Sequence, residues 1–356
     1  MVVWLKRGLG LALLLLALWG MDTAATNYLE PTYYTLLVNI GRFVILAVSL
    51  NLINGITGQF SLGHMAFFAL GGYAAAVVTK MVGHRLFGPV PSVSEGIPAF
   101  WYAWFAGSLL FGGLVAAVVG LAVGLPTLRL RGDYLAIVTL GMGEIVNIVI
   151  QNQEWIGGAL GFADLPLFVR PGTGIFWIYL VAVATVLAIR NITQTTHGRA
   201  LMAIREDEVA AQAMGVNVVR YKVLAFMVGA FFAGIAGGLY AHQQGIITPR
   251  DASFVRSIEI VVMVALGGSG SITGSILAAA ILTALPEFLR EAVGRLPYEQ
   301  QEGARQLIEQ LQMVIYALLL IVLMLVRPQG LLGARELSLR NLLRRRKPRS
   351  APEPSG

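Results

Sequence analysis

The sequence predicts an all-α polytopic membrane protein with about ten transmembrane helices, and three observations support this. Of its 356 residues, 56% are hydrophobic, and the mean hydropathy is +0.72. Only 13% are charged, about half the share found in a soluble domain. Apolar runs long enough to cross a bilayer, about 20 residues each, recur along the chain. We therefore expect one transmembrane domain over residues 1–333 and a basic, disordered tail over 334–356.

Composition also excludes several kinds of site. The chain has no cysteine, which rules out disulfides, thiolate metal sites and cysteine nucleophiles. Its four histidines are far apart without an HExxH motif, and no GxxxxGK[ST] sequence forms a P-loop. Much of the net charge of +7 lies in the tail Arg340–Arg349, which marks a cytoplasmic side before it suggests nucleic acid. We expect no metal, cofactor or nucleic acid bound to this chain.

The apolar runs give the expected order of spans. The first is either a retained span, which we prefer, or a signal peptide cleaved near Thr23-Ala24-Ala25. Arg42 interrupts the second, so its side chain must snorkel or face a polar interior. Two later runs carry small residues at a spacing of four, which indicates close helix packing and places the second of them centrally. These ladders are Gly112, Ala116, Gly120 and Gly124, and Gly229, Ala233, Gly237 and Ala241.

A polar element interrupts the apolar sequence at 51–76. Its polar side chains would be costly against lipid, so we expect them to face protein or a cavity. It is either a tight turn between two spans or a polar element beside a pathway through the membrane, with Asn54, Thr57, Gly58, Gln59, Ser61, Gly63 and His64 as its candidates. Glu144 is a second intramembrane candidate. A structural hydrogen bond to a neighbouring span is its preferred role, and a proton relay is the alternative.

The longest polar stretch between spans covers residues 191–222, which we call the island. Asp207 suits an N-cap and Gly215 suits the position after a helix, so 208–214 predicts a helix of about two turns. One side of this helix is apolar and holds Val209, Ala210, Ala213 and Met214. The opposite side is polar and holds Glu208 and Gln212. Such a helix either rests on lipid headgroups or docks a soluble partner.

Charge and parity predict the topology. Placing the basic residues 6–7, 129–131, the island and the tail in the cytoplasm puts both termini inside. Parity then requires an even number of crossings between the island and the tail. The glycine-interrupted segment 258–289 must therefore contain either two short spans that meet near 267–274 or a re-entrant hairpin, which gives ten crossings in all.

Several motifs, in this order, resemble those of one transporter family. They are NLINGITGQFSLGHMAFFALGGYAA, LRLRGDYLAIVTLGMGEIV, GRALMAIREDEVAAQAMGVNVVRYKVLAF, LGGSGSITGSILAA and RPQGLLG. Together they resemble the inner-membrane permeases of branched-chain amino acid ABC importers, of the LivM type, over roughly 36–333. The resemblance implies a second permease of the LivH type, two ATPase subunits that bind ATP and magnesium, and a periplasmic binding protein. It implies transport of leucine, isoleucine or valine into the cytoplasm, and a fold similar to type II importers.

The resemblance also assigns candidate residues. Residues 208–211, with Gly215 four residues on, are similar to the loop of importer permeases whose short helix docks on the ATPase. The candidates for coupling are Gly198, Arg199, Arg205, Glu206, Asp207, Glu208, Ala210, Ala211, Met214 and Gly215. For the substrate pathway we expect the polar element first, then Gly267, Gly268 and Gly270, with Glu144 as a further candidate.

Two departures from the family pattern and three rival functions stay open. Arg42 replaces an apolar residue, and Ile156-Gly157-Gly158 replaces Thr-Gly-Gly, which puts any role of that loop in doubt. An ion-coupled secondary carrier would use Glu144, Asp133 or Glu259 as its relay. A membrane-embedded enzyme would need a catalytic cluster, and the sequence contains no such motif. A permease for other amino acids, urea or short amides is the closest alternative.

The topology can be tested at residues 290–306, which we expect on the periplasmic side. A single cysteine at Gln301, in this cysteine-free chain, should react with an impermeant thiol reagent in intact spheroplasts. Labelling that occurs only after permeabilisation would contradict the ten-crossing arrangement.

Overall fold

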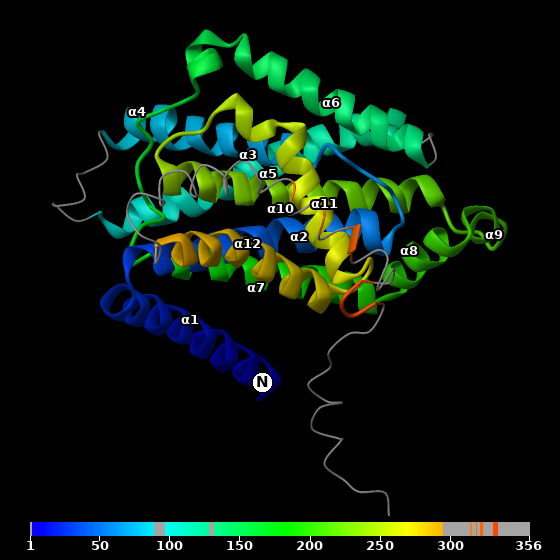
Figure 1. The fold of residues 1–356 in the computed structure, drawn as a ribbon, viewed down its shortest axis with the longest axis horizontal. Helices are drawn as coiled ribbons and strands as arrows, with labels where there is room; N and C mark the ends of the chain where they lie inside the picture. Colours follow the sequence, from blue (N-terminus) through cyan, green and yellow to red (C-terminus); the bar gives the residue numbers. More distant parts are fainter. Residues whose placement is uncertain are drawn as a thin grey trace, which may run out of the picture.

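The computed structural model describes residues 2–88, 97–127 and 132–294, with 314, 318, 321–322 and 330–333. This part of the chain is helical, and its only β pairing is an isolated bridge between Phe162 and Ile247 (Figure 1). The helices are α1 (Val2–Tyr28), α2 (Pro31–Asn51), η1 (Leu52–Ile56), α3 (His64–Val77), η2 (Val78–Val82), α4 (Gly83–Phe87), α5 (Ala99–Thr127), α6 (Asp133–Gln151), η4 (Glu154–Ile156), η5 (Gly158–Leu160), α7 (Gly174–Gln194), α8 (Thr196–Glu206), α9 (Glu208–Ala213), α10 (Val218–Gln244), η6 (Pro249–Ala252), α11 (Phe254–Gly267) and α12 (Ile272–Gly294).

Seven helical segments in the described residues are long and apolar enough to cross a membrane. They are Pro31–Ile56, His64–Phe87, Ala99–Leu125, Tyr134–Gln151, Gly174–Gln194, Val218–Gln244 and Ile272–Glu291. The expected all-α polytopic fold is therefore confirmed, but the expected ten crossings exceed this count. The expected last span, 311–326, falls mostly outside the described residues, as do Gln301 and the tail 334–356.

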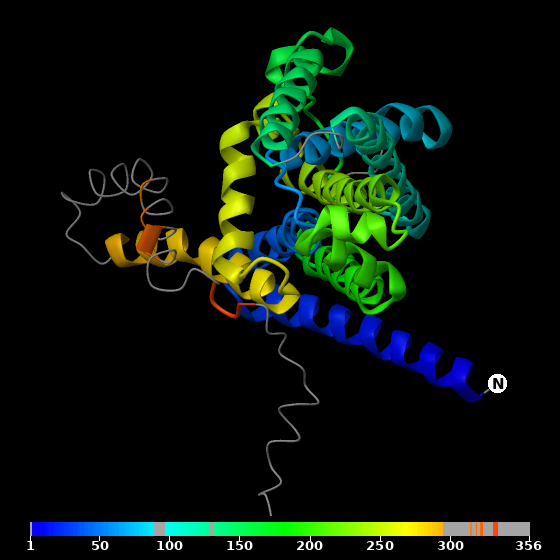
Figure 2. The same cartoon turned by 90° about the vertical axis from the view of Figure 1, so that its right-hand side faces the viewer.

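Helix α10 lies at the centre of the bundle, as its small-residue ladder predicts. It packs against α5, α3, α2 and α7, and Figure 2 shows it among them in an end-on view. A side chain on Gly237 would collide with the backbone of Phe68 in α3, and a Cβ on Gly234 would lie 2.6 Å from Ala116 in α5. The small residues of α5 face α10, because a Cβ on Gly120 would lie 2.8 Å from the Cβ of Ala230 in α10. Small residues thus let three backbones approach closely where lipid provides no hydrophobic drive between helices.

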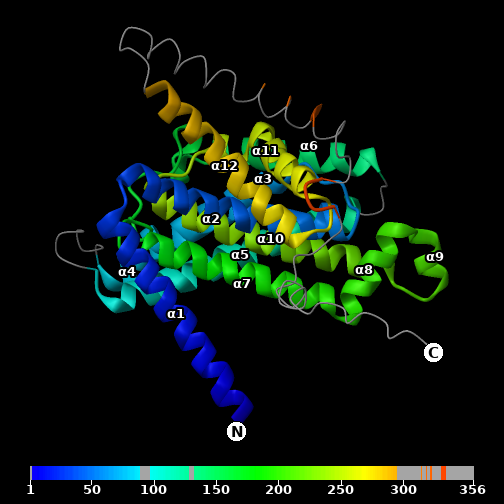
Figure 3. The same ribbon diagram turned by 60° about the horizontal axis from the view of Figure 1, so that its bottom comes forward.

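The two ends of the bundle are distinguished by the loops that gather there. Helices α8 and α9 project from one end of the long axis, and α4 lies at the other (Figure 1). Helix α12 runs beside α2 (Figure 3). The two are antiparallel: Tyr33 donates a 3.0 Å hydrogen bond to Glu291 at one end, and the Gly270 amide donates a 2.9 Å bond to Asn51 at the other. We call these the outer end and the island end.

The segment 258–289 is divided at the glycine loop, as expected. Helix α11 has 14 residues, about 21 Å at 1.5 Å per residue, which is too short to cross a bilayer core of about 30 Å. It leads to the glycine loop at the island end, where a Cβ on Gly267 would collide with the backbone of Gly274. Helix α12 then returns across the full bundle. The observed pair is therefore one short helix and one full-length span rather than two short spans.

Arg42 faces a polar interior and does not snorkel. Its side chain is buried, and Nη1 donates a 3.1 Å hydrogen bond to Oε1 of Gln243. Its guanidinium also lies 4.7 Å from the ring centroid of Tyr240, a cation–π contact. Of the two possibilities that the sequence left open, the tertiary structure selects this one.

The packing of α10 generates a stability prediction. We expect Gly237→Ala to lower the melting temperature of the purified protein by several degrees, because overpacking costs about 1–3 kcal/mol. The measurement is thermal unfolding in detergent, followed by size-exclusion chromatography. Gly107→Ala on α5 is the matched control: nothing lies within 4 Å of the added Cβ, so it should melt at or slightly above the wild-type temperature. Equal melting of the two variants would contradict the close α3–α10 contact.

Candidate functional site

The island folds into two helices, α8 and α9, of which only the second was predicted. The caps of α9 are those expected. Asp207 Oδ1 accepts hydrogen bonds from the backbone amides of Val209 and Ala210, at 2.8 and 3.0 Å. Gly215 has φ +83°, and the amides of Gly215 and Val216 bond to the carbonyls of Gln212 and Ala211, which is a Schellman ending. The helix ends at Ala213, one residue before the predicted end.

The apolar side of α9 is exposed in this chain. Val209 is 62% exposed and Met214 85%, and Ala210 and Ala213 are also exposed. Ala211 faces inward instead, where it packs with Ile204 of α8 and Val218 of α10. The helix therefore presents an apolar surface that no described part of the chain covers.

Two inward contacts hold the island on the bundle. The Glu208 carboxylate lies 2.8 Å from the Lys222 ammonium, and both side chains are largely buried. Glu208 thus faces away from the exposed apolar residues of α9, on the opposite side of the helix, as the sequence predicts. On α8, Leu201 and Ile204 are buried and Gly198 packs against the backbone of Thr193. Their spacing is the helical signal that could have revealed α8. Arg199, in contrast, is exposed.

The polar element joins two separate spans, Pro31–Ile56 and His64–Phe87, through residues 57–63, so it is a connection between spans. Helix α2 continues into the π-helical turn η1, and α3 begins only at His64. Asn54 closes the gap between them, since its side chain donates to the Ser61 carbonyl at 3.3 Å and accepts from the Ser61 amide at 3.1 Å. The Thr57 hydroxyl donates to the Leu52 carbonyl at 2.7 Å. Gly63 lies against the backbone of Thr139 in α6.

Buried polar atoms without a hydrogen-bond partner gather at the connection between α2 and α3. In the described residues there are five such side-chain atoms, and four belong to this segment: Asn51 Nδ2, Gln59 Oε1, Ser61 Oγ and His64 Nδ1. Other atoms of the same residues are bonded, such as His64 Nε2 to the Ser49 hydroxyl at 3.0 Å. Because buried polar groups in proteins are nearly always satisfied, this segment has unused capacity for water or for a polar ligand.

One arginine joins the island to the polar element and to the glycine loop 267–274. Arg205 Nη1 donates a 3.0 Å hydrogen bond to the Gly55 carbonyl of η1, while Nη2 lies 2.7 Å from Glu206 Oε1. A Cβ on Gly58 would lie 2.7 Å from Arg205 Cγ, and one on Gly270 would lie 2.8 Å from Arg205 Nη1. Glycine is required at both positions, whose φ values are +72° and +95°.

Asn51 completes this contact, which we call the polar junction: Asn51, Gly55, Arg205 and Gly270. Its Oδ1 accepts the Gly270 amide at 2.9 Å. Gly268, with φ +104°, packs against Gly330 near the last motif. The first and second sets of predicted pathway residues, 54–64 and 267–270, thus meet beneath the predicted coupling loop. Asn51 itself was not among the predicted residues, although it opens the same polar element.

Glu144 lies apart from the polar junction. It accepts a 3.4 Å hydrogen bond from Asn147, one turn along its own helix α6, rather than from the neighbouring span that we expected. Within the described residues no three His, Asp or Glu side chains are close enough to hold a metal ion.

Comparison with known proteins places this arrangement in a family. Residues 32–324 match the family model described as "Branched-chain amino acid transport system / permease component". The chain is 33% identical over 321 residues to the high-affinity branched-chain amino acid transport system permease protein LivM of Salmonella typhimurium, covering 82% of this chain and 67% of that protein. The LivM of Escherichia coli gives the same identity and coverage.

More distant relatives carry similar names. The permease BraD of Pseudomonas aeruginosa is 25% identical, with 87% of this chain and 97% of that protein covered. Among solved structures, PsaBC from Streptococcus pneumoniae in complex with Fab has a TM-score of 0.41 at 17% identity, over 87% of this chain and 96% of that one. That likeness is too weak to support an argument. From the match across most of its length, the chain belongs to the family of branched-chain amino acid transport system permease components.

Proposed function

We propose that this chain is a membrane-spanning permease subunit of an ATP-driven importer, which moves branched-chain amino acids from the periplasm to the cytoplasm by alternating access. The observation that carries the proposal is the exposed apolar side of α9, joined through Arg205 to η1 at the end of the span Pro31–Ile56. Family membership supports the substrate class, because the LivM and BraD relatives are named for branched-chain amino acid transport.

The apolar side of α9 is the surface for an ATPase subunit. A capped helix that exposes Val209, Ala210 and Met214 offers a rigid apolar ridge to a complementary groove. The chain itself is not an enzyme in this proposal. ATP and magnesium bind to the two ATPase subunits, and this chain needs no cofactor of its own.

The polar junction passes the motion of the ATPase to the spans. When the ATPases close, α8 and α9 move with them, and Arg205 carries that movement to Gly55 and Gly270. The atoms of Gln59, Ser61 and His64 that have no partner in this conformation gain partners in the other, so the two states differ in contacts. Such a difference is what a ligand or a partner needs in order to shift a conformational equilibrium.

The remaining partners and the orientation follow from the family and from charge. A second permease of the LivH type completes the membrane part, and a periplasmic binding protein delivers the substrate. Two relatives named LivH, from Salmonella typhimurium and Escherichia coli, are each 24% identical to this chain, which supports pairing between related permeases. The island end carries Arg199, Arg205, Arg220 and Lys222, which supports a cytoplasmic island by the positive-inside rule. We infer that both termini are also cytoplasmic, because basic residues 6–7 and the basic tail belong on the same side, with the spans in the bacterial inner membrane.

The docking role of α9 is tested by a charge on its apolar side. Ala210→Asp should lower the affinity of the ATPase at least 100-fold, because an unpaired buried charge costs about 3–5 kcal/mol. The measurement is co-purification of the ATPase and substrate-stimulated ATP hydrolysis. Gln212→Asp puts the same charge on the opposite side of the same helix and should retain both. Full ATPase recovery with Ala210→Asp would favour a helix that only rests on headgroups.

The transmitting role of Arg205 is tested separately. Arg205→Ala removes a charged hydrogen bond, worth about 1.5–3 kcal/mol, from the polar junction. We expect the ATPase to co-purify normally, while leucine uptake in proteoliposomes falls about ten- to hundred-fold. Arg220→Ala, an exposed arginine at the start of α10, is the control and should transport normally. Normal uptake by Arg205→Ala would mean that motion reaches the spans by another contact.

A further inference from the structure

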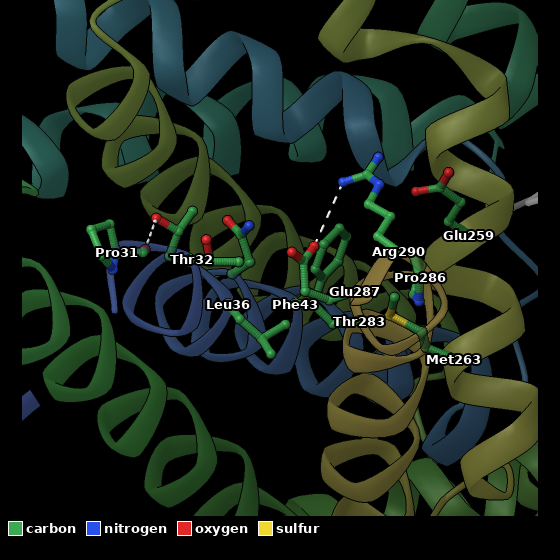
Figure 4. A pocket seen from close by; sticks show the side chains of 12 residues that line it. Pro31, Thr32, Leu36, Phe43, Glu259, Met263, Thr283, Pro286, Glu287 and Arg290 are labelled. Carbon is green, nitrogen blue, oxygen red and sulfur yellow. Dashed lines mark hydrogen bonds and ion pairs between the residues drawn. The ribbon is translucent and has the colours of Figure 1, made fainter. Parts of the chain in front are cut away.

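A cavity of about 490 Å³ opens between α2, α11 and α12, away from the polar junction. Figure 4 shows side chains of all three helices turned toward this space. Its volume is within the range of about 300–1,000 Å³ that small-molecule sites occupy.

The cavity runs from the outer end of the bundle to the middle of the membrane. Its outer residues, Pro31 and Arg290, lie where α2 begins and near where α12 ends. Phe43, at the other end of its lining, is 12 positions after Pro31 in the same chain, about 18 Å deeper at 1.5 Å per residue. A solute from the outer side would therefore reach more than half the depth of the span.

The lining combines opposite charges with an apolar wall. Glu259 of α11 and the pair Glu287 and Arg290 of α12 supply the charges, and the two members of the pair lie 3.6 Å apart. Leu36, Phe43 and Met263 supply the apolar part. A few placed polar groups beside apolar walls are what a zwitterion with an aliphatic side chain requires.

Glu259 is the residue that most needs a ligand. Its carboxylate makes no hydrogen bond and no ion pair in the described part of the chain, and only the more distant charges of Arg256 and Arg42 act on it. Those two arginines already have nearer partners: Arg256 Nη1 lies 3.1 Å from Asp251 Oδ1, and Arg42 bonds to Gln243. Because an unpaired carboxylate inside a membrane protein is costly, an incoming ammonium group would be favoured there.

Asn39 connects the cavity wall to this buried polar network. Its Oδ1 accepts a 3.3 Å hydrogen bond from Gln243, which in turn accepts the bond from Arg42. The wall behind the cavity is thus held in one orientation by bonds between α2 and α10. A preorganised wall reduces the conformational cost of binding.

We propose that this cavity is an amino-acid site of the permease, an inference that rests on the proposed function. Glu259 binds the α-ammonium group, and Arg290, which lies 3.6 Å from Glu287, binds the α-carboxylate. Leu36, Phe43 and Met263 bind the aliphatic side chain. The site lies before the connection between α2 and α3 on the route from the outer end, so it receives the substrate before the polar junction releases it.

Cysteine protection in the complete reconstituted importer tests this site. Thr283→Cys removes one methyl group, replaces the hydroxyl by a thiol, and puts that thiol in the cavity lining of a cysteine-free chain. We expect a small hydrophilic methanethiosulfonate to label it, and saturating L-leucine to slow labelling at least tenfold. 4-Methylpentanoate, which has the same side chain and carboxylate but no ammonium group, should not protect. Leu160→Cys, 88% exposed in an outer loop, is the control and should label equally with and without leucine.

A second variant tests the role assigned to Glu259. Glu259→Gln on the Thr283→Cys background should abolish protection by L-leucine and raise the KM for uptake at least tenfold, with ATPase recovery unchanged. Glu259→Asp should restore part of the protection. If Thr283→Cys transports leucine normally but is unlabelled, or is labelled without protection, the site is wrong and the proposed function stands. If the wild-type complex fails to take up any branched-chain amino acid, the proposed function is wrong as well.

Discussion

The close approach of α10 to α3 and α5 is the constraint on which the rest of the structure depends. In a bilayer the hydrophobic effect does not bring apolar helices together, because lipid tails are equally apolar. Helix association therefore depends on van der Waals contact between closely approaching backbones. Gly234 and Gly237 allow this on α10, and Ala116 and Gly120 allow it on α5. With these backbones together, α2 and η1 pack on another side of α10, and the start of α10 brings Lys222 under the island. The positions of both polar regions therefore depend on close helix contacts that small residues permit.

Around α10 and its close neighbours, the chain buries polar groups that lower the stability of the fold. Four unpartnered polar atoms gather where α2 breaks into η1 and a loop before α3. A second polar network surrounds the buried Arg42, which is held by Gln243 and the ring of Tyr240. Unsatisfied or charged groups inside a membrane protein cost free energy. These groups are concentrated in two places, one beside the cavity and one where α2 connects to α3, as a path for a polar solute would require.

The arrangement suggests a sequence of contacts along one axis. The cavity between α2, α11 and α12 lies toward the outer end, the connection between α2 and α3 lies below it, and the polar junction links η1 to the island. Helix α2 takes part in all three, since it lines the cavity with Phe43, supplies Asn51 to the junction and continues into η1. A displacement of Arg205 would therefore act on the same helix that forms the wall of the proposed amino-acid site.

The sequence by itself determined the features that depend on neighbouring residues. Asp207 and Gly215 predict the two ends of α9, because caps are formed by hydrogen bonds within a few positions. The spacing of Gly229, Ala233 and Gly237 predicts a central helix, since positions four apart share one face. The polar character of 54–64 likewise marks a segment that cannot face lipid.

Only the tertiary structure decided which distant groups meet. Arg205 reaches Gly55 across 150 positions, and Gly270 reaches Asn51 across 219. The same holds for the contact of Glu208 with Lys222 and for a cavity assembled from α2, α11 and α12. No local pattern encodes such contacts, because they depend on the order and rotation of packed helices, which a spacing along one helix does not specify.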